Sequence, residues 1–106
     1  MIDWDRINEL RDEVGEDDFR DVLGMFFEEV EAVLDGLSPG PTLARDLHFL
    51  KGSALNIGMK DVSDLCREYE QRLNEGTAVA DETSAIVSAY QASKAEISNL
   101  PTRSAL

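Results

Sequence analysis

The chain has 106 residues, of which 42% are apolar, so it is long and hydrophobic enough for one packed domain, and disorder throughout is excluded. Its 22 Asp and Glu against 10 Lys and Arg give a net charge of −12, which argues against nucleic acid or an anionic membrane as a partner. The single cysteine excludes a disulfide framework, and no stretch approaches the roughly 20 apolar residues of a membrane span.

The N-terminal residues lack the positively charged and apolar regions of a signal peptide. One lone cysteine also fits a reducing compartment. We therefore expect a soluble, cytoplasmic protein that binds neither nucleic acid nor membranes. One domain is expected over residues 1–100, and residues 101–106 are expected to fray.

Helical periodicity is visible in almost every segment, and no run alternates in the manner of a β-strand. The first predicted helix is short. It begins after Asp3, whose side chain suits an N-cap, and it ends at Gly15. Ile7, Leu10 and Val14 form its apolar side.

The second predicted helix, over about 17–37, has the clearest apolar face. Its apolar residues follow the i, i+3, i+4, i+7 spacing of an amphipathic helix and fall within an arc of about 140°. The segment Ser38-Pro39-Gly40-Pro41 then breaks the chain. The apolar face of this helix consists of Phe19, Val22, Leu23, Phe26, Phe27, Val30, Val33, Leu34 and Leu37.

Three further helices are expected in the rest of the chain. The third runs from residue 41 or 42 to 57 and is followed by Gly58, a natural residue after a C-cap. The fourth covers 60–74. The fifth covers 81–100 and is stopped by Pro101. The pattern predicts an all-α fold, an antiparallel up-down-up-down four-helix bundle in which the short first helix caps one end.

The only histidine, His48, lies on the third predicted helix. On a helical wheel it stands about 140° from the centre of the apolar stripe of that helix. We therefore expect its imidazole to face water, although an ordinary surface histidine would satisfy the same geometry. The stripe consists of Leu43, Leu47, Leu50, Ala54 and Ile57.

Two neighbours of His48 indicate phosphoryl chemistry. Lys51 and Gly52 follow at i+3 and i+4 and share its helix surface. Lysine binds phosphate as a point charge. Glycine inside a helix costs about 1 kcal/mol relative to alanine. At Gly52 the missing side chain either leaves space beside the imidazole or permits close packing between helices. A neutral imidazole nitrogen is a nucleophile near neutral pH, and phosphoryl transfer needs mainly positioning and charge neutralisation.

Other chemistry finds little support. Cys66 lies in an apolar stripe and is expected in the core, and Trp4 is expected to pack the first helix onto the bundle. No second histidine is present for a zinc or di-metal site, so no metal is expected. There is no Gly-rich phosphate loop for a nucleotide.

The His48-x-x-Lys51-Gly52 pattern, with Gly58 further on, resembles the signature of histidine phosphotransfer (HPt) domains. Ser53 and Ala54 match small-residue positions of that signature. The downstream pairs Leu65-Cys66 and Tyr69-Glu70 resemble the next helix of the family. The likeness covers nearly the whole chain.

The resemblance implies a phosphocarrier whose exposed histidine receives a phosphoryl group from the aspartate of one receiver domain and passes it to another. No ATP-dependent kinase activity of its own is expected. The expected partners are response-regulator receiver domains, alone or within a hybrid sensor histidine kinase. The protein would be a monomer without a cofactor, and Mg²⁺ would be bound by the receiver.

Some family members have a glutamine that bonds the histidine ring, and the corresponding position here is Glu70. Its carboxylate could orient the ring, or it could be a solvated flank residue. Ala44 and Leu55 flank His48 on the wheel, and Phe49 lies toward the other side. These three residues could form an apolar docking surface, or Phe49 could tuck against the second helix.

Two other functions compete with the phosphocarrier. One is a phosphate-independent helical adaptor that binds receiver domains, which the intact pattern of histidine, lysine and glycine disfavours. The other is the dimerising phosphoacceptor domain of a sensor kinase. The dimer of such a domain needs an exposed apolar seam, whereas the only apolar face of the second predicted helix is expected in the core.

Overall fold

A computed structural model describes residues 2–38, 40–76 and 83–99. Their secondary structure is helical apart from one isolated bridge, which confirms the predicted all-α class. Several predictions lie outside these residues. They are the turn residue Pro39, the start of the last helix at Asp81, its end at Leu100 and the tail 101–106. The helices are α1 (Trp4–Val14), α2 (Glu16–Asp35), α3 (Leu43–Asn56), α4 (Lys60–Asn74) and α5 (Thr83–Ser98).

Local chemistry accounts for the helix ends. The Asp3 carboxylate accepts a hydrogen bond from the Arg6 backbone N–H at 3.2 Å, so Asp3 is the N-cap expected for α1. Gly15 ends α1 with a φ of +85°, and α2 follows directly. The structure ends α2 two residues before the predicted Leu37, because the N–H groups of Gly36 and Leu37 make tight i→i−3 turns instead.

The start of α3 also differs slightly from prediction. Regular helix begins at Leu43 rather than at residue 41 or 42, because the Leu43 N–H bonds the Gly40 carbonyl in a turn. The bounds of α4 agree with the predicted 60–74. Each amphipathic segment of the sequence therefore forms its own helix, and the deviations are confined to the ends.

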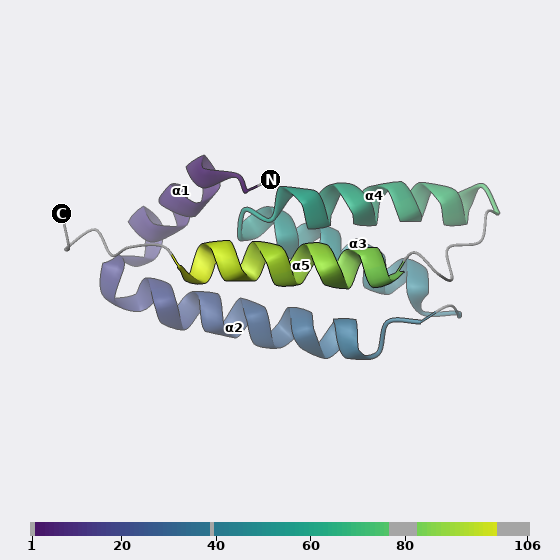
Figure 1. The fold of residues 1–106 in the computed structure, drawn as a ribbon, viewed down its shortest axis with the longest axis horizontal. Helices are drawn as coiled ribbons and strands as arrows, with labels where there is room; N and C mark the ends of the chain where they lie inside the picture. Colours follow the sequence, from purple (N-terminus) through teal and green to yellow (C-terminus); the bar gives the residue numbers. More distant parts are fainter. Residues whose placement is uncertain (1, 39, 77–82, 100–106) are drawn as a thin grey trace.

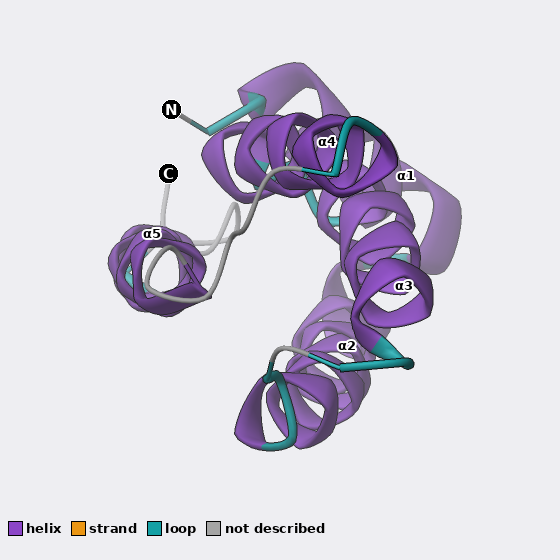
Figure 2. Ribbon diagram, turned by 90° about the vertical axis from the view of Figure 1, so that its right-hand side faces the viewer, coloured by secondary structure: helices purple, strands orange, loops and turns teal. Residues whose placement is uncertain are grey.

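Helices α2 to α5 lie along the long axis of a rod-shaped molecule with extents of 50 × 21 × 20 Å (Figure 1). The chain runs along α2 in one direction, returns along α3, reverses again in α4 and returns in α5, while α1 is inclined at one end (Figure 1). Viewed along the rod, α2, α3 and α4 follow an arc and α5 lies on its open side (Figure 2).

The core is built most completely from α3. All five residues of its predicted apolar stripe are at most 2% exposed. On α2, by contrast, only Phe19, Leu23 and Val30 are fully buried, and the other six residues of its apolar face are half-buried. Burial of apolar side chains at roughly 25 cal/mol per Å² makes α3 the helix whose orientation is most strongly fixed.

The α1 helix is held against the turn between α3 and α4. The Asp3 N–H donates to the Gly58 carbonyl at 2.8 Å, and the Arg6 Nε donates to the Asn56 carbonyl at 2.9 Å. Gly58 has a φ of +73°, and a Cβ there would lie 2.8 Å from the Asp3 carbonyl oxygen and 3.0 Å from the Ile7 side chain. Glycine is therefore required at this turn for both backbone conformation and space.

The prediction that Trp4 packs α1 onto the bundle is wrong. Trp4 is 42% exposed, whereas Ile7 is fully buried and Ile2 is 6% exposed. Ile2 forms a backbone bridge with Met59, so it takes the buried position at this end of the rod. The Trp4 ring is left at the surface, where it lines a shallow groove together with Leu55.

A polar contact joins α2 to α5. The Glu31 carboxylate accepts hydrogen bonds from the Tyr90 hydroxyl at 2.6 Å and from Lys94 Nζ at 2.5 Å. The Phe27 and Tyr90 rings meet edge to face with centroids 6.3 Å apart. The bonds from Lys94 and then Tyr90 lower the pKa of Glu31, while burial and Glu31 raise the pKa of the Tyr90 phenol. The carboxylate therefore remains an acceptor and the phenol a donor.

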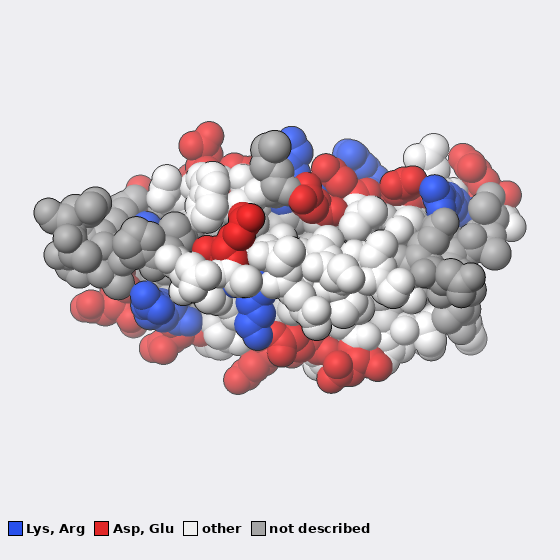
Figure 3. All heavy atoms as spheres, in the orientation of Figure 1, with Lys and Arg blue, Asp and Glu red and all other residues white. Residues whose placement is uncertain are grey.

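Acidic side chains lie along the α2 and α4 edges of the face shown in Figure 3, and an uncharged stretch lies between them over the right-hand part of α5. Within the described residues, no helix combines the length and hydrophobicity needed to cross a bilayer.

Candidate functional site

His48 lies in the middle of α3 with its side chain 74% exposed, as the helical wheel predicts. The preceding residue, Leu47, and the residue two positions on, Leu50, are fully buried. The backbone that carries the imidazole is therefore anchored by the core, while the ring itself is open to solvent. An approaching protein can reach the ring without any rearrangement of the bundle.

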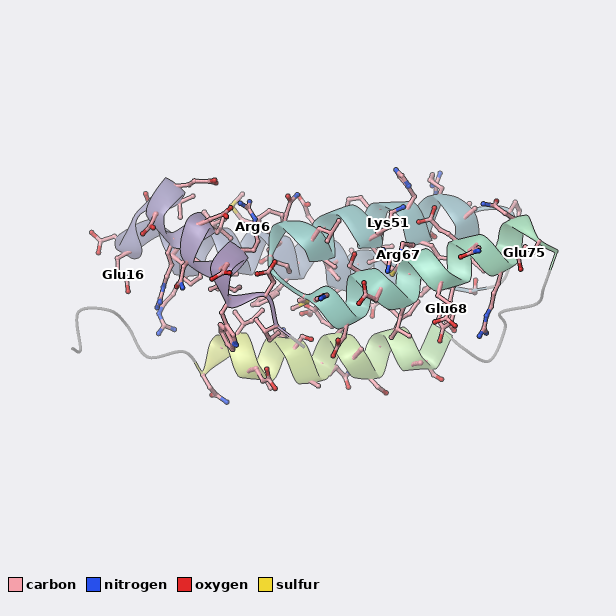
Figure 4. The ribbon with its side chains drawn as sticks, turned by 90° about the horizontal axis from the view of Figure 1, so that it is seen from above. Arg6, Glu16, Lys51, Arg67, Glu68 and Glu75 are labelled. Atoms are coloured by element: carbon pink, nitrogen blue, oxygen red, sulfur yellow. The ribbon has the colours of Figure 1, made fainter. Side chains whose placement is uncertain are left out.

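Glu70 on α4 faces both His48 and Lys51. Its Oε2 lies 3.5 Å from His48 Nδ1, and its Oε1 lies 3.1 Å from Lys51 Nζ. The Glu70 side chain is 21% exposed and the Lys51 side chain 27%, so this ion pair is more sheltered than the imidazole. Figure 4 shows Lys51 on the side of α3 that adjoins α4. The structure thus brings three of the sequence-predicted site residues together.

The orientation of the imidazole distinguishes its two nitrogens. Nδ1 is turned toward the Glu70 carboxylate, an acceptor that suits an N–H on that nitrogen. The two ring nitrogens point away from each other, so Nε2 faces away from Glu70. When the hydrogen is on Nδ1, Nε2 has the free lone pair.

Gly52 leaves the surface beside the imidazole empty. A Cβ placed on Gly52 would meet no heavy atom within 4 Å, so this glycine does not serve close packing between helices. The two small residues that follow it, Ser53 and Ala54, are buried. Open space at Gly52 is therefore a feature of the solvent face of α3.

Cys66 lies beneath the site and is fully buried, as expected of a core residue. Burial and, to a smaller extent, the negative charge of Glu70 together raise the pKa of its thiol to about 12, with Lys51 acting in the opposite sense. The thiol is therefore neutral and has no nucleophilic role near neutral pH.

Exposed apolar side chains are also present on α3, the helix that carries the imidazole. Ala44 is exposed, Phe49 is 38% exposed and Leu55 is 56% exposed. Trp4 is a further exposed apolar side chain, and it lines one groove together with Leu55. Sequence reasoning missed Trp4 because nothing in the periodicity of α1 showed that Ile2 would take the buried place.

Arg45 is a second cation that sequence reasoning missed. It lies one turn before His48, at i−3, and its side chain is 78% exposed. The same i±3 spacing that singled out Lys51 could have identified it. Among the described residues, no group of three or more His, Cys, Asp or Glu side chains converges in the manner of a metal site.

Comparison with known protein families agrees with this geometry. The family model described as the Hpt domain matches residues 21–100, which include most of α2, all of α3, α4 and α5, and every residue of the candidate site except Trp4. No curated protein and no solved structure matches the chain.

The chain therefore belongs to the Hpt domain family, which confirms the resemblance found in the sequence. Membership implies histidine phosphotransfer in phosphorelays and interaction with receiver domains in general.

Proposed function

We propose that this chain relays a phosphoryl group between the aspartates of receiver domains through Nε2 of His48. The observation that carries the proposal is the exposed imidazole of the only histidine, with Nδ1 facing Glu70 and Nε2 open. We further propose that residues 1–100 act as one antiparallel up-down-up-down bundle capped by α1. The protein would work as a cytoplasmic monomer without ATP-dependent kinase activity.

The transfer step requires little from the carrier. The Nε2 lone pair attacks the phosphorus of the acyl phosphate on the receiver, so that an N–P bond forms. The O–P bond breaks, and its electron pair remains on the aspartate carboxylate. No proton has to leave for this step, because Nδ1 keeps its hydrogen toward Glu70. The reverse sequence delivers the phosphoryl group to a second receiver.

Lys51 and Gly52 would serve the phosphoryl group once it is on the ring. Lys51 supplies a positive charge one turn from the imidazole. The empty space at Gly52 admits the phosphoryl oxygens and the receiver loop that brings them. The carboxylates and Mg²⁺ needed for the acyl phosphate belong to the receiver, so the carrier would need no cofactor.

Docking would use the exposed apolar side chains of α3. Ala44, Phe49 and Leu55 would contact the receiver, with Trp4 at the edge of the surface. An apolar surface of this kind can seat a partner whose charges then pair at the rim. The receiver could be a separate response regulator or part of a hybrid sensor kinase.

The test is to incubate the protein with a panel of ³²P-labelled receiver domains and to compare it with His48→Gln. We expect acid-labile, base-stable label on the parent and none on the variant, whose unfolding curve should match that of the parent. Label on the variant, or no label on the parent with any receiver, would reject the relay. Equal binding of receivers by both proteins without label would instead support the phosphate-independent adaptor.

A further inference from the structure

We propose that Glu70 is a positioning residue that competes with the phosphoryl group for Lys51 and so drives the group onward to the receiver. This inference rests on the proposed function. Each carboxylate oxygen of Glu70 has its own neighbour, since Oε1 lies 3.1 Å from Lys51 Nζ and Oε2 lies 3.5 Å from His48 Nδ1. One residue therefore orients the ring and also holds the adjacent cation.

Phosphorylation would change the charge balance of this group. Before transfer, the positive charge of Lys51 is matched by Glu70 in a sheltered ion pair. Transfer adds one net negative charge to the ring and its phosphoryl group, because the two negative charges of the phosphoryl oxygens outweigh the positive charge of a ring that keeps its Nδ1 hydrogen. These oxygens would lie on the other side of the ring, within reach of a lysine at i+3. Lys51 cannot neutralise both anions fully, so phosphohistidine either loses this cation or takes it from Glu70.

Both outcomes disfavour the phosphorylated form relative to a site with a neutral residue at position 70. The remaining carboxylate also repels the phosphoryl group across the ring. Because Glu70 and Lys51 are only partly exposed, solvent screens these effects incompletely. Orientation of the ring needs only an acceptor oxygen, which glutamine also offers, so the charge of Glu70 is a separate contribution.

The first experiment measures the phosphotransfer equilibrium between the carrier and one receiver. We expect Glu70→Gln to raise the equilibrium ratio of phosphorylated to unphosphorylated carrier by about three- to tenfold. Glu68→Gln is the matched control, because it makes the same charge change on the same helix. Glu68 pairs with Arg72 and points to the other side of α4 from Lys51 (Figure 4). Glu68→Gln should leave the ratio unchanged.

A double-mutant cycle then tests competition for the lysine. In the parent, Lys51→Gln removes the phosphate contact and the Glu70 contact together. In the Glu70→Gln background it removes only the phosphate contact. We therefore expect Lys51→Gln to lower the phosphorylated fraction more strongly in the Glu70→Gln background. If the free-energy effects of Lys51→Gln and Glu70→Gln on phosphorylation were additive, Glu70 would not compete with the phosphoryl group for Lys51.

A spectroscopic measurement separates orientation from charge. The ¹H–¹⁵N spectrum of the His48 ring should show the Nδ1–H tautomer in the parent and in Glu70→Gln, and a loss of that preference in Glu70→Ala. A parent that accepts label while Glu70→Gln leaves the ratio unchanged would reject this inference and leave the relay intact. A parent that accepts no label would reject the relay itself.

Discussion

Glu31 and Glu70 each connect two helices, and they differ in the solvent exposure of their partners. On the α2–α5 side, Glu31 bonds Tyr90, which is 3% exposed, and Lys94. Both contacts are short, and they lower the pKa of Glu31. On the α3–α4 side, Glu70 makes longer contacts with a lysine and with an imidazole that is 74% exposed.

The comparison shows that a carboxylate with two donors can belong either to a structural link or to a candidate reactive site. A carboxylate with a cation and a second donor is a structural link when the second donor is a buried phenol. In the proposed function, the same set would serve as a reactive site because its second donor is a ring whose other nitrogen faces solvent. The contrast predicts that changes around Glu31 act on stability and changes around Glu70 act on transfer.

Tyr90→Phe should have the largest effect on stability. It removes the hydroxyl that bonds Glu31, and a hydrogen bond to a charged group contributes about 1–2 kcal/mol where the acceptor can be rehydrated. Urea unfolding should show this loss, while the rate of phosphotransfer stays at the parent value. His48→Gln should abolish phosphotransfer and leave the free energy of unfolding unchanged. Slower phosphotransfer by Tyr90→Phe, under conditions where the variant is fully folded, would contradict the separation between the structural Glu31 link and the transfer site.

Gly52→Ala should have a smaller effect on stability and of opposite sign. Alanine meets no neighbour there, so the helix should gain about 0.5–1 kcal/mol. Transfer should slow because the methyl group fills the space beside the imidazole. Gly24→Ala on α2 is the matched control, since a Cβ there also meets nothing within 4 Å. It should stabilise without slowing transfer, and equal transfer by both variants would remove the steric role of Gly52.

The pH dependence of the Glu31 link should be the smallest effect. Because the folded-state pKa of Glu31 lies below its ordinary value of 4.5, its contribution to stability is fully present above about pH 4.5. The contribution is lost as the pH falls through the lower folded-state value. Unfolding of the parent and of Glu31→Gln at pH 6 and pH 3.5 should show a steeper acid loss in the parent. Equal losses would show that the link does not titrate.

Features that depend on one helix were predictable from the sequence. The wheel of α3 placed its apolar stripe inside and His48 outside, and the bounds of α4 followed from its amphipathic pattern. Asp3 and Gly15 marked the ends of α1 through cap chemistry that needs no tertiary contact.

Features that depend on two helices were not predictable in the same way. The bonds from Tyr90 and Lys94 to Glu31 depend on how α2 and α5 are rotated and offset, which no single periodicity encodes. The exposure of Trp4 likewise depends on a competing residue, Ile2, which pairs with the turn after α3. Glu70 was placed near the ring by family resemblance, but its ion pair with Lys51 was not foreseen.

The single imidazole sits on one flank of a rod about 20 Å across. A standard protein interface covers roughly 800 Å² on each partner, a large part of one flank of a molecule whose whole surface is 6288 Å². In the proposed relay, the donor and the acceptor receiver would therefore occupy the same flank in turn. The relay would follow double-displacement kinetics, and its throughput would depend on how quickly each complex dissociates.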